Sequence, residues 1–164
     1  MAKVLLFVAL CLLPALVSAS RMVKDPLLVQ GHVYCDRCRA GFETPNSRFV
    51  PDAKVKVICH DRKTNQVVYE REGYTDKAGK YEIPVHEDHW DLICDAVLVK
   101  SSQPDCATVT PGRERATVIL TNNNGVASTT RYANAMGFMA DEPEAGCAEI
   151  MKMYQEDEED VPGR

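Results

Sequence analysis

The sequence has no excess of basic residues and no long apolar run beyond its N-terminus. Among its 164 residues, 19 are lysine or arginine and 24 are aspartate or glutamate, a formal net charge of −5. Nucleic-acid-binding domains usually present a basic face. A membrane-spanning helix needs about 20 consecutive apolar residues, and no segment reaches that length. The composition therefore argues against a nucleic-acid-binding protein and against a membrane-spanning one.

Motifs of familiar catalytic sites are missing as well. We find no glycine-rich phosphate loop, and no serine or cysteine in the local setting of a known hydrolase nucleophile. His86 and His89 have no third ligand nearby, so they are more typical of a polar loop than of a metal site. Trp90, the single tryptophan, follows them, and general burial preferences favour packing in the core or at its rim over a sugar platform. We predict no enzymatic activity, cofactor or metal.

The N-terminus has the pattern of a secretory signal peptide. Lys3 precedes an apolar run over residues 4–13, which is too short to span a bilayer, and small residues follow at 17–20. Cleavage is expected after Ala19, so the mature protein is predicted to be soluble, secreted and located in the extracellular space. The sequence contains no Asn-x-Ser/Thr sequon, so N-glycosylation is not expected.

The cysteines fit this compartment. Seven are present, and Cys11 leaves with the signal peptide. An even set in an oxidising compartment predicts three disulfides. The six that remain are Cys35, Cys38, Cys59, Cys94, Cys106 and Cys147. Their pairing stays open at this point, because six cysteines can pair in many ways.

Cys35 and Cys38 form a Cys-x-x-Cys pair with two sharper interpretations. A redox centre usually needs a helix N-terminus in a βαβ context, but here a predicted strand precedes the pair. A zinc site would need further ligands, such as Cys59 with His60 or the pair His86 and His89. The favoured interpretation is two structural cysteines, each bonded to a distant partner.

The remaining sequence is dominated by short segments of β type. Residues 54–60 alternate apolar and polar side chains, which is the pattern of a half-buried strand. About seven such strands separated by turns predict an all-β fold, an antiparallel barrel or sandwich. The expected strands are residues 27–34, 54–60, 66–71, 80–85, 92–99, 116–121 and 126–132.

Two turns and one helix complete the expected organisation. A tight turn is predicted at residues 76–79, and a hairpin at residues 122–125, where Asn-Gly is a strong signal. One short C-terminal helix is expected over residues 144–155, with Pro143 near its first turn. Its shared face would hold Cys147, Ile150, Met151 and Tyr154. Residues 20–155 then form a single disulfide-braced domain, and residues 156–164 an acidic, disordered tail.

The segment around the first two cysteines carries a longer motif. It reads Gln30-Gly31-His32-Val33-Tyr34-Cys35-Asp36-Arg37-Cys38-Arg39-Ala40-Gly41-Phe42. This resembles the major olive-pollen allergen (Ole e I) family, whose motif runs Gln-Gly-x-Val-Tyr-Cys-Asp-x-Cys-Arg. The matched positions besides the cysteines are Gln30, Gly31, Val33, Tyr34, Asp36 and Arg39.

The resemblance extends over roughly residues 27–155, with two departures. It continues through Ala53-Lys54-Val55-Lys56-Val57, Gly73-Tyr74-Thr75, Asp105-Cys106, Asn134-Ala135-Met136-Gly137-Phe138 and Cys147. Arg37 stands where the family more often has threonine, and Ala135-Met136 where Pro-Leu is usual. The resemblance implies a β-barrel or sandwich with the pairs Cys35–Cys106, Cys38–Cys147 and Cys59–Cys94.

The function implied by the resemblance is that of a secreted, non-enzymatic plant protein. Family members are linked to pollen hydration, germination and tube growth, and several are allergens. The expected partner is an unknown extracellular protein, such as a receptor, or a cell-wall component. Two alternatives come from the residues themselves. One is a trypsin-type protease inhibitor presenting Arg37 or Arg39, with Arg48 nearby, on a disulfide-braced loop. The other is an oxidoreductase using Cys35 and Cys38.

Overall fold

The computed structural model describes residues 26–159, with side chains to residue 155. The expected signal peptide, residues 1–19, lies outside the described residues. The described part contains ten strands and one helix. They are β1 (Leu27–Asp36), β2 (Arg48–Phe49), β3 (Lys54–Asp61), β4 (Val67–Tyr74), β5 (Lys80–Val85), β6 (Leu92–Lys100), β7 (Thr108–Val109), β8 (Arg115–Val118), β9 (Thr130–Tyr132), β10 (Met136–Met139) and α2 (Cys147–Glu159).

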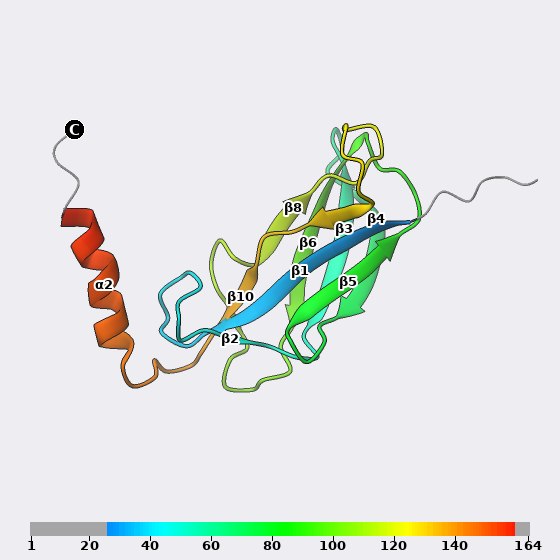
Figure 1. Cartoon of the computed structure of the whole chain (residues 1–164). Helices are drawn as coiled ribbons and strands as arrows, with labels where there is room; N and C mark the ends of the chain where they lie inside the picture. The colour runs from blue at the N-terminus through cyan, green and yellow to red at the C-terminus, as the bar shows by residue number, and fades with distance from the viewer. Residues whose placement is uncertain (1–25, 160–164) are drawn as a thin grey trace, which may run out of the picture.

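The strands form two sheets that face each other (Figure 1). One sheet has the order β4-β3-β6-β8, and all its pairings are antiparallel. The six-stranded sheet is built around β1, which pairs with β5 and β2 in antiparallel fashion and with β9 and β10 in parallel. β7 is added beyond β10. Because β1 takes four partners along its ten residues, it is the centre of this sheet.

The hydrophobic core lies between the two sheets. β1 and β3 alternate in burial, as their sequence pattern predicts, and each turns one face inward. Val29 and Ile83 come from the six-stranded sheet, and Val57 and Ala96 from the other; all four are at most 1% exposed. This burial supplies the main drive for folding, at about 25 cal/mol for each Å² of apolar surface removed from water.

The architecture confirms a mostly β fold and corrects two details. All seven expected strands are present at least in part, and β2, β7 and β10 were not predicted. The two sheets do not close into a barrel, so the sandwich is the right description. The expected antiparallel pairing holds for most strand pairs, but β9 and β10 run parallel to β1. Parallel neighbours need a long crossover, which the intervening four-stranded sheet provides.

The predicted hairpin at residues 122–125 is also wrong. β8 pairs with β6 in one sheet, whereas β9 pairs with β1 in the other. The loop between β8 and β9 is held by a side chain and not by backbone pairing of the two strands. Buried Arg131 donates to the carbonyl oxygens of Ile119 at 3.1 Å and Thr121 at 2.7 Å. Asn-Gly is a local signal, and it cannot tell a hairpin from a loop that crosses between sheets.

The turn at residues 76–79 is present, although the strands on either side belong to different sheets. Gly79 adopts φ +69°, and a Cβ there would lie 2.8 Å from the Val33 carbonyl oxygen. Asp76 fixes the turn by accepting hydrogen bonds from the backbone N–H groups of Ala78 and Lys80. Glycine is therefore required at this position for both its backbone angle and its lack of a side chain.

The C-terminal helix is shifted from its predicted place. α2 begins at Cys147, not at residue 144, because Gly146 adopts φ +88° and Glu144 is held by contacts to other segments. It ends at Glu159, so the first residues of the expected acidic tail are helical. Figure 1 shows α2 standing beyond one end of the sandwich. Within the described residues, no helix is long and apolar enough to cross a membrane.

Gly31 provides a test of this packing. Its inward face is covered by the Tyr81 ring, and a Cβ at Gly31 would lie 2.4 Å from the tyrosine oxygen. Tyr81 is fully buried, so its ring has little room to move. We expect Gly31→Ala to lower the free energy of unfolding by about 1–3 kcal/mol. Urea denaturation measures this, with Gln30→Ala on the opposite face as the control. Equal stability of Gly31→Ala and wild type would contradict the packing described here.

Candidate functional site

The family motif occupies the end of β1 and the loop after it. We call residues 37–47, between β1 and β2, the motif loop. Asp36 is fully buried at the start of this loop. Its carboxylate accepts hydrogen bonds from the backbone N–H of Cys38 at 3.2 Å and of Gly41 at 2.7 Å. A buried carboxylate is tolerated where its oxygens are bonded in this way, so Asp36 sets the path of the chain between the two cysteines.

Arg39 joins the motif loop to the C-terminal segment. Its Nη1 donates to the carbonyl oxygens of Ala140 at 2.6 Å and Asp141 at 3.0 Å. Arg39 itself has φ +54°, an uncommon angle for a residue with a side chain. The Ala140 N–H in turn donates to the Asp36 carbonyl at 3.1 Å. Asp36 and Arg39 therefore hold together two segments that lie about 100 residues apart in the sequence.

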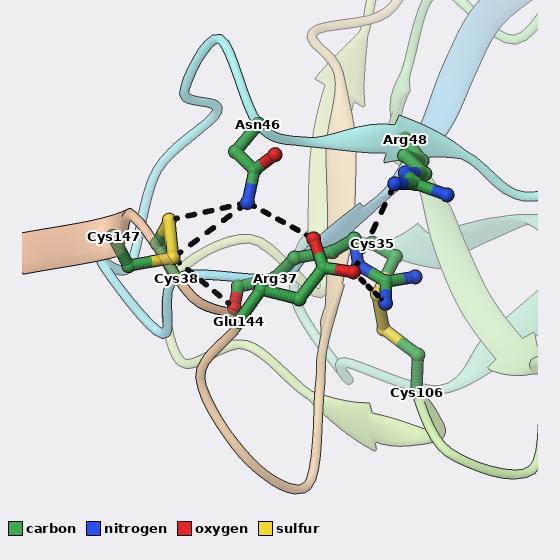
Figure 2. A network of polar contacts seen from close by, with 8 residues as sticks. All are labelled: Cys35, Arg37, Cys38, Asn46, Arg48, Cys106, Glu144 and Cys147. Carbon is green, nitrogen blue, oxygen red and sulfur yellow. Dashed lines mark hydrogen bonds and ion pairs between the residues drawn. A yellow bond between two sulfur atoms is a disulfide. The ribbon is translucent and has the colours of Figure 1, made fainter. Parts of the chain in front are cut away.

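A second set of contacts surrounds Glu144 (Figure 2). Its carboxylate forms an ion pair with Arg37, lies 3.8 Å from an Arg48 nitrogen, and accepts a hydrogen bond from Asn46 Nδ2 at 3.0 Å. The hydrogen bond from Arg37, strengthened by the charges of both arginines, lowers the pKa of the Glu144 carboxyl. Arg37 is the position where the sequence departs from the family motif, and here it supplies an ion pair.

Disulfides add to these contacts between the motif loop and residues 140–147, which we together call the junction. The structure contains Cys35–Cys106, Cys38–Cys147 and Cys59–Cys94, the same pairs that the family resemblance implies. Cys38–Cys147 fixes the first residue of α2 to the motif loop (Figure 2). Cys35 and Cys38 each bond elsewhere, so the Cys-x-x-Cys pair is not a disulfide of its own. Bridges that close loops this long each typically contribute about 2–4 kcal/mol.

The other motif positions belong to the sheet itself. Val33 faces the core, and the Gln30 carbonyl accepts a hydrogen bond from the Ala133 N–H at 2.8 Å. The Tyr34 ring covers Gly137 on β10, where a Cβ would lie 2.6 Å from the ring. Burial raises the pKa of the Tyr34 hydroxyl. Val33 and Tyr34 therefore position strands through their side chains, whereas the Gln30 contact is made by its backbone.

Nothing in this junction resembles a reactive centre. Within the described part of the chain, no group of three or more His, Cys, Asp or Glu side chains could hold a metal ion. His86 is exposed, whereas His89 is buried and its ring lies 4.4 Å from that of Tyr69. The expectation that Trp90 packs in the core or at its rim is wrong, because its side chain is 70% exposed. The residues around Trp90 in the sequence do not by themselves predict this exposure.

Comparison with known proteins identifies the family. The model of the family described as "Pollen protein Ole e 1 like" matches residues 25–155. This chain belongs to the Ole e 1-like family. The resemblance seen in the motif is thereby confirmed, and the contacts described above give Asp36 and Arg39 of that motif a structural role in this member.

Individual relatives cover nearly the whole chain. The Arabidopsis thaliana "Protein DOWNSTREAM OF FLC" is 45% identical over 93% of this chain and 92% of its own length. The Crocus sativus "Pollen allergen Cro s 1" is 42% identical over 90% of this chain and 89% of its own. The crystal structure of the plantain pollen allergen Pla l 1 is 32% identical, with a TM-score of 0.68 over 74% of this chain and 98% of that one. The fold of this chain is therefore shared with Pla l 1.

The ion pair of Glu144 predicts a pH-dependent stability. Its folded pKa lies below the ordinary value of 4.5, so the stabilisation is complete above that value and is lost as the pH falls through the folded pKa. We expect Glu144→Gln to be less stable than wild type at pH 7, and the difference to vanish in acid. Urea unfolding midpoints measured from pH 7 to pH 2 test this.

The matched control is Glu142→Gln, which removes an exposed carboxylate two residues away. Its midpoint should follow that of wild type across the range. A Glu144→Gln midpoint that differs from wild type equally at pH 7 and in acid would rule out the proposed linkage.

Proposed function

We propose that this protein is a secreted, non-enzymatic plant protein that acts by binding a receptor or a cell-wall component in the extracellular space during pollen hydration, germination or tube growth. The observation that carries the proposal is membership of the Ole e 1-like family, whose model matches nearly all of the chain outside the expected signal peptide. Relatives named as pollen allergens support a role in pollen, and their names refer to no enzymatic activity.

The character of the junction also supports a binding role. Asp36, Arg37 and Arg39 are engaged in contacts within the chain, and all six cysteines of the described residues are paired. Such a framework leaves loops and outward strand faces as the surfaces available to a partner. A disulfide-braced sandwich suits the extracellular space, where these bonds persist.

The protease-inhibitor alternative gains no support from the positions of the two arginines. An inhibitor must present its arginine outward on a loop that a protease can enter. Arg37 instead pairs with Glu144. Arg39 is exposed, but its guanidinium donates to the carbonyl oxygens of Ala140 and Asp141. Using either one would require breaking the junction that fixes the C-terminal segment. Binding through another surface is the better proposal.

The proposal predicts that the correctly oxidised protein retains a defined partner from pollen or cell-wall extracts. We expect immobilised oxidised protein to capture the same component repeatedly, because the disulfides hold the binding surface in one shape. Reduced and alkylated protein is the control and should not capture it. Repeated failure with oxidised protein, or equal capture by the reduced form, would contradict the proposal.

A further inference from the structure

Trp90 lies on the loop between β5 and β6, at one end of the four-stranded sheet. Two adjoining hollows are both lined by Trp90 and Arg62. The smaller, of about 120 Å³, runs over the outer face of β6 and β8, where Ile93 and Ile119 are exposed. The wider, of about 630 Å³, is bordered by charged side chains. An exposed apolar surface edged by polar groups commonly marks a binding site.

The loop that carries Trp90 is held firmly in place. The Asp88 carboxylate accepts hydrogen bonds from the Trp90 N–H at 3.1 Å, from Thr121 Oγ1 at 3.1 Å and from the Asn122 N–H at 2.9 Å. The N–H of the buried His89 donates to the Leu120 carbonyl at 2.7 Å. Hydrogen bonds of Asp88 and His89 therefore hold the loop against residues 120–122.

Further contacts fix the neighbouring wall. The Arg62 guanidinium donates through Nε to the Asp91 carbonyl at 3.0 Å and through Nη2 to the Leu92 carbonyl at 3.3 Å. The Cys59–Cys94 disulfide links β3 and β6, and Cys94 lines the smaller hollow. Trp90 thus exposes a large apolar side chain on a backbone that supporting hydrogen bonds fix in place. This is the character of a prepared binding site, because little backbone order is lost when a ligand binds.

The side chains around the Trp90 indole indicate which class of ligand would bind. The wider hollow is bordered by two cationic side chains, Arg62 and Lys63, and two carboxylates, Asp61 and Asp91. Its formal charge is balanced, so it favours an uncharged ligand over an anion or a cation. Asp61 Oδ1 already accepts hydrogen bonds from the N–H groups of Lys63 and Thr64. The Lys63 ammonium and the Asp91 carboxylate still provide a donor and an acceptor side by side, which suits hydroxyl groups, since each hydroxyl can both donate and accept. The indole face offers an apolar platform for the C–H face of a sugar ring.

A flat protein partner fits this surface less well. Covering all four charged side chains with another protein would remove them from water, and that desolvation is costly unless each charge is paired. A glycan chain can leave them partly hydrated while its hydroxyls bond to them.

We propose that Trp90, with Arg62, Lys63, Asp61 and Asp91 around it, forms a subsite for a sugar ring of a neutral glycan chain. The inference rests on the proposed function and deepens it, because it names a ligand class and a site for binding in the cell wall.

The sequence provides a direct probe of this site. Trp90 is the only tryptophan in the chain, so intrinsic tryptophan fluorescence reports on the subsite alone. The full mature protein is titrated with neutral hexasaccharides of β-linked glucose, xylose, mannose and galactose, and with hexagalacturonate as the acidic counterpart. We expect at least one neutral hexasaccharide to shift the Trp90 emission to the blue in a saturable way and to protect it from quenching by acrylamide.

Variants then test whether the sugar binds at Trp90 and not elsewhere on the protein. Trp90→Ala should weaken binding of that hexasaccharide at least about tenfold by calorimetry, and Trp90→Phe should retain part of the affinity. The matched control is Tyr132→Ala, which removes a side chain 74% exposed on the opposite sheet and should bind like wild type. Because Trp90 is exposed, Trp90→Ala should keep the wild-type melting temperature.

Three results would overturn the inference: no neutral hexasaccharide is bound at about 1 mM, only hexagalacturonate is bound, or Trp90→Ala binds as tightly as wild type. The capture experiment distinguishes this failure from a failure of the proposed function. If Trp90→Ala still retains the extract partner and no sugar binds, the subsite is wrong and the proposed function stands. If the wild-type protein retains nothing and binds no sugar, both are wrong.

Discussion

The structure depends on β1 being enclosed on both of its edges. Four strands pair with it: β5 and β2 on antiparallel registers, β9 and β10 on parallel ones. Two positions of β1 are constrained by their neighbours. A side chain at Gly31 would meet the Tyr81 ring, and the Asp36 carboxylate accepts two hydrogen bonds from the backbone of the motif loop. Many residues of β1 therefore have fixed neighbours. This fits a family motif that is a continuous run of residues and not only a pair of cysteines.

The motif loop, directly after β1, ties the C-terminal segment to the sandwich. Cys35 bonds to Cys106 within the core, and Cys38, only three residues later, bonds to Cys147 at the start of α2. Arg39 and the Arg37–Glu144 pair then bring the C-terminal segment against the motif loop. The apparent reactive motif is therefore a branch point of the scaffold. Asp36, Arg37 and Arg39 hold segments together there, and the proposed sugar subsite lies elsewhere, on the loop that carries Trp90.

Much of this fold could be predicted from the sequence. Alternation along residues 54–60 located β3, and the apolar run at residues 92–99 located β6, because these strands bury one face or more. The motif residues gave the family and with it the disulfide pairs. The short strands β2, β7 and β10 were missed, since two to four residues are too few to show a period. The parallel pairing of β9 was missed because pairing partners depend on the whole chain, and local turn signals at residues 122–125 do not report it. The exposure of Trp90 could not be predicted either, because its position is set by Asp88 and by segments far away in the sequence.

Peptide mapping of the non-reduced protein, folded under oxidising conditions, tests the central role of β1 most directly. After denaturation, trypsin cleaves at Arg37 and so separates Cys35 from Cys38. The account predicts that mass spectrometry finds these two cysteines in different cross-linked species, one joined to Cys106 and the other to Cys147. A species that joins Cys35 directly to Cys38 would contradict it, because the strand would then end in a local redox-type pair and the junction with the C-terminal segment would not exist.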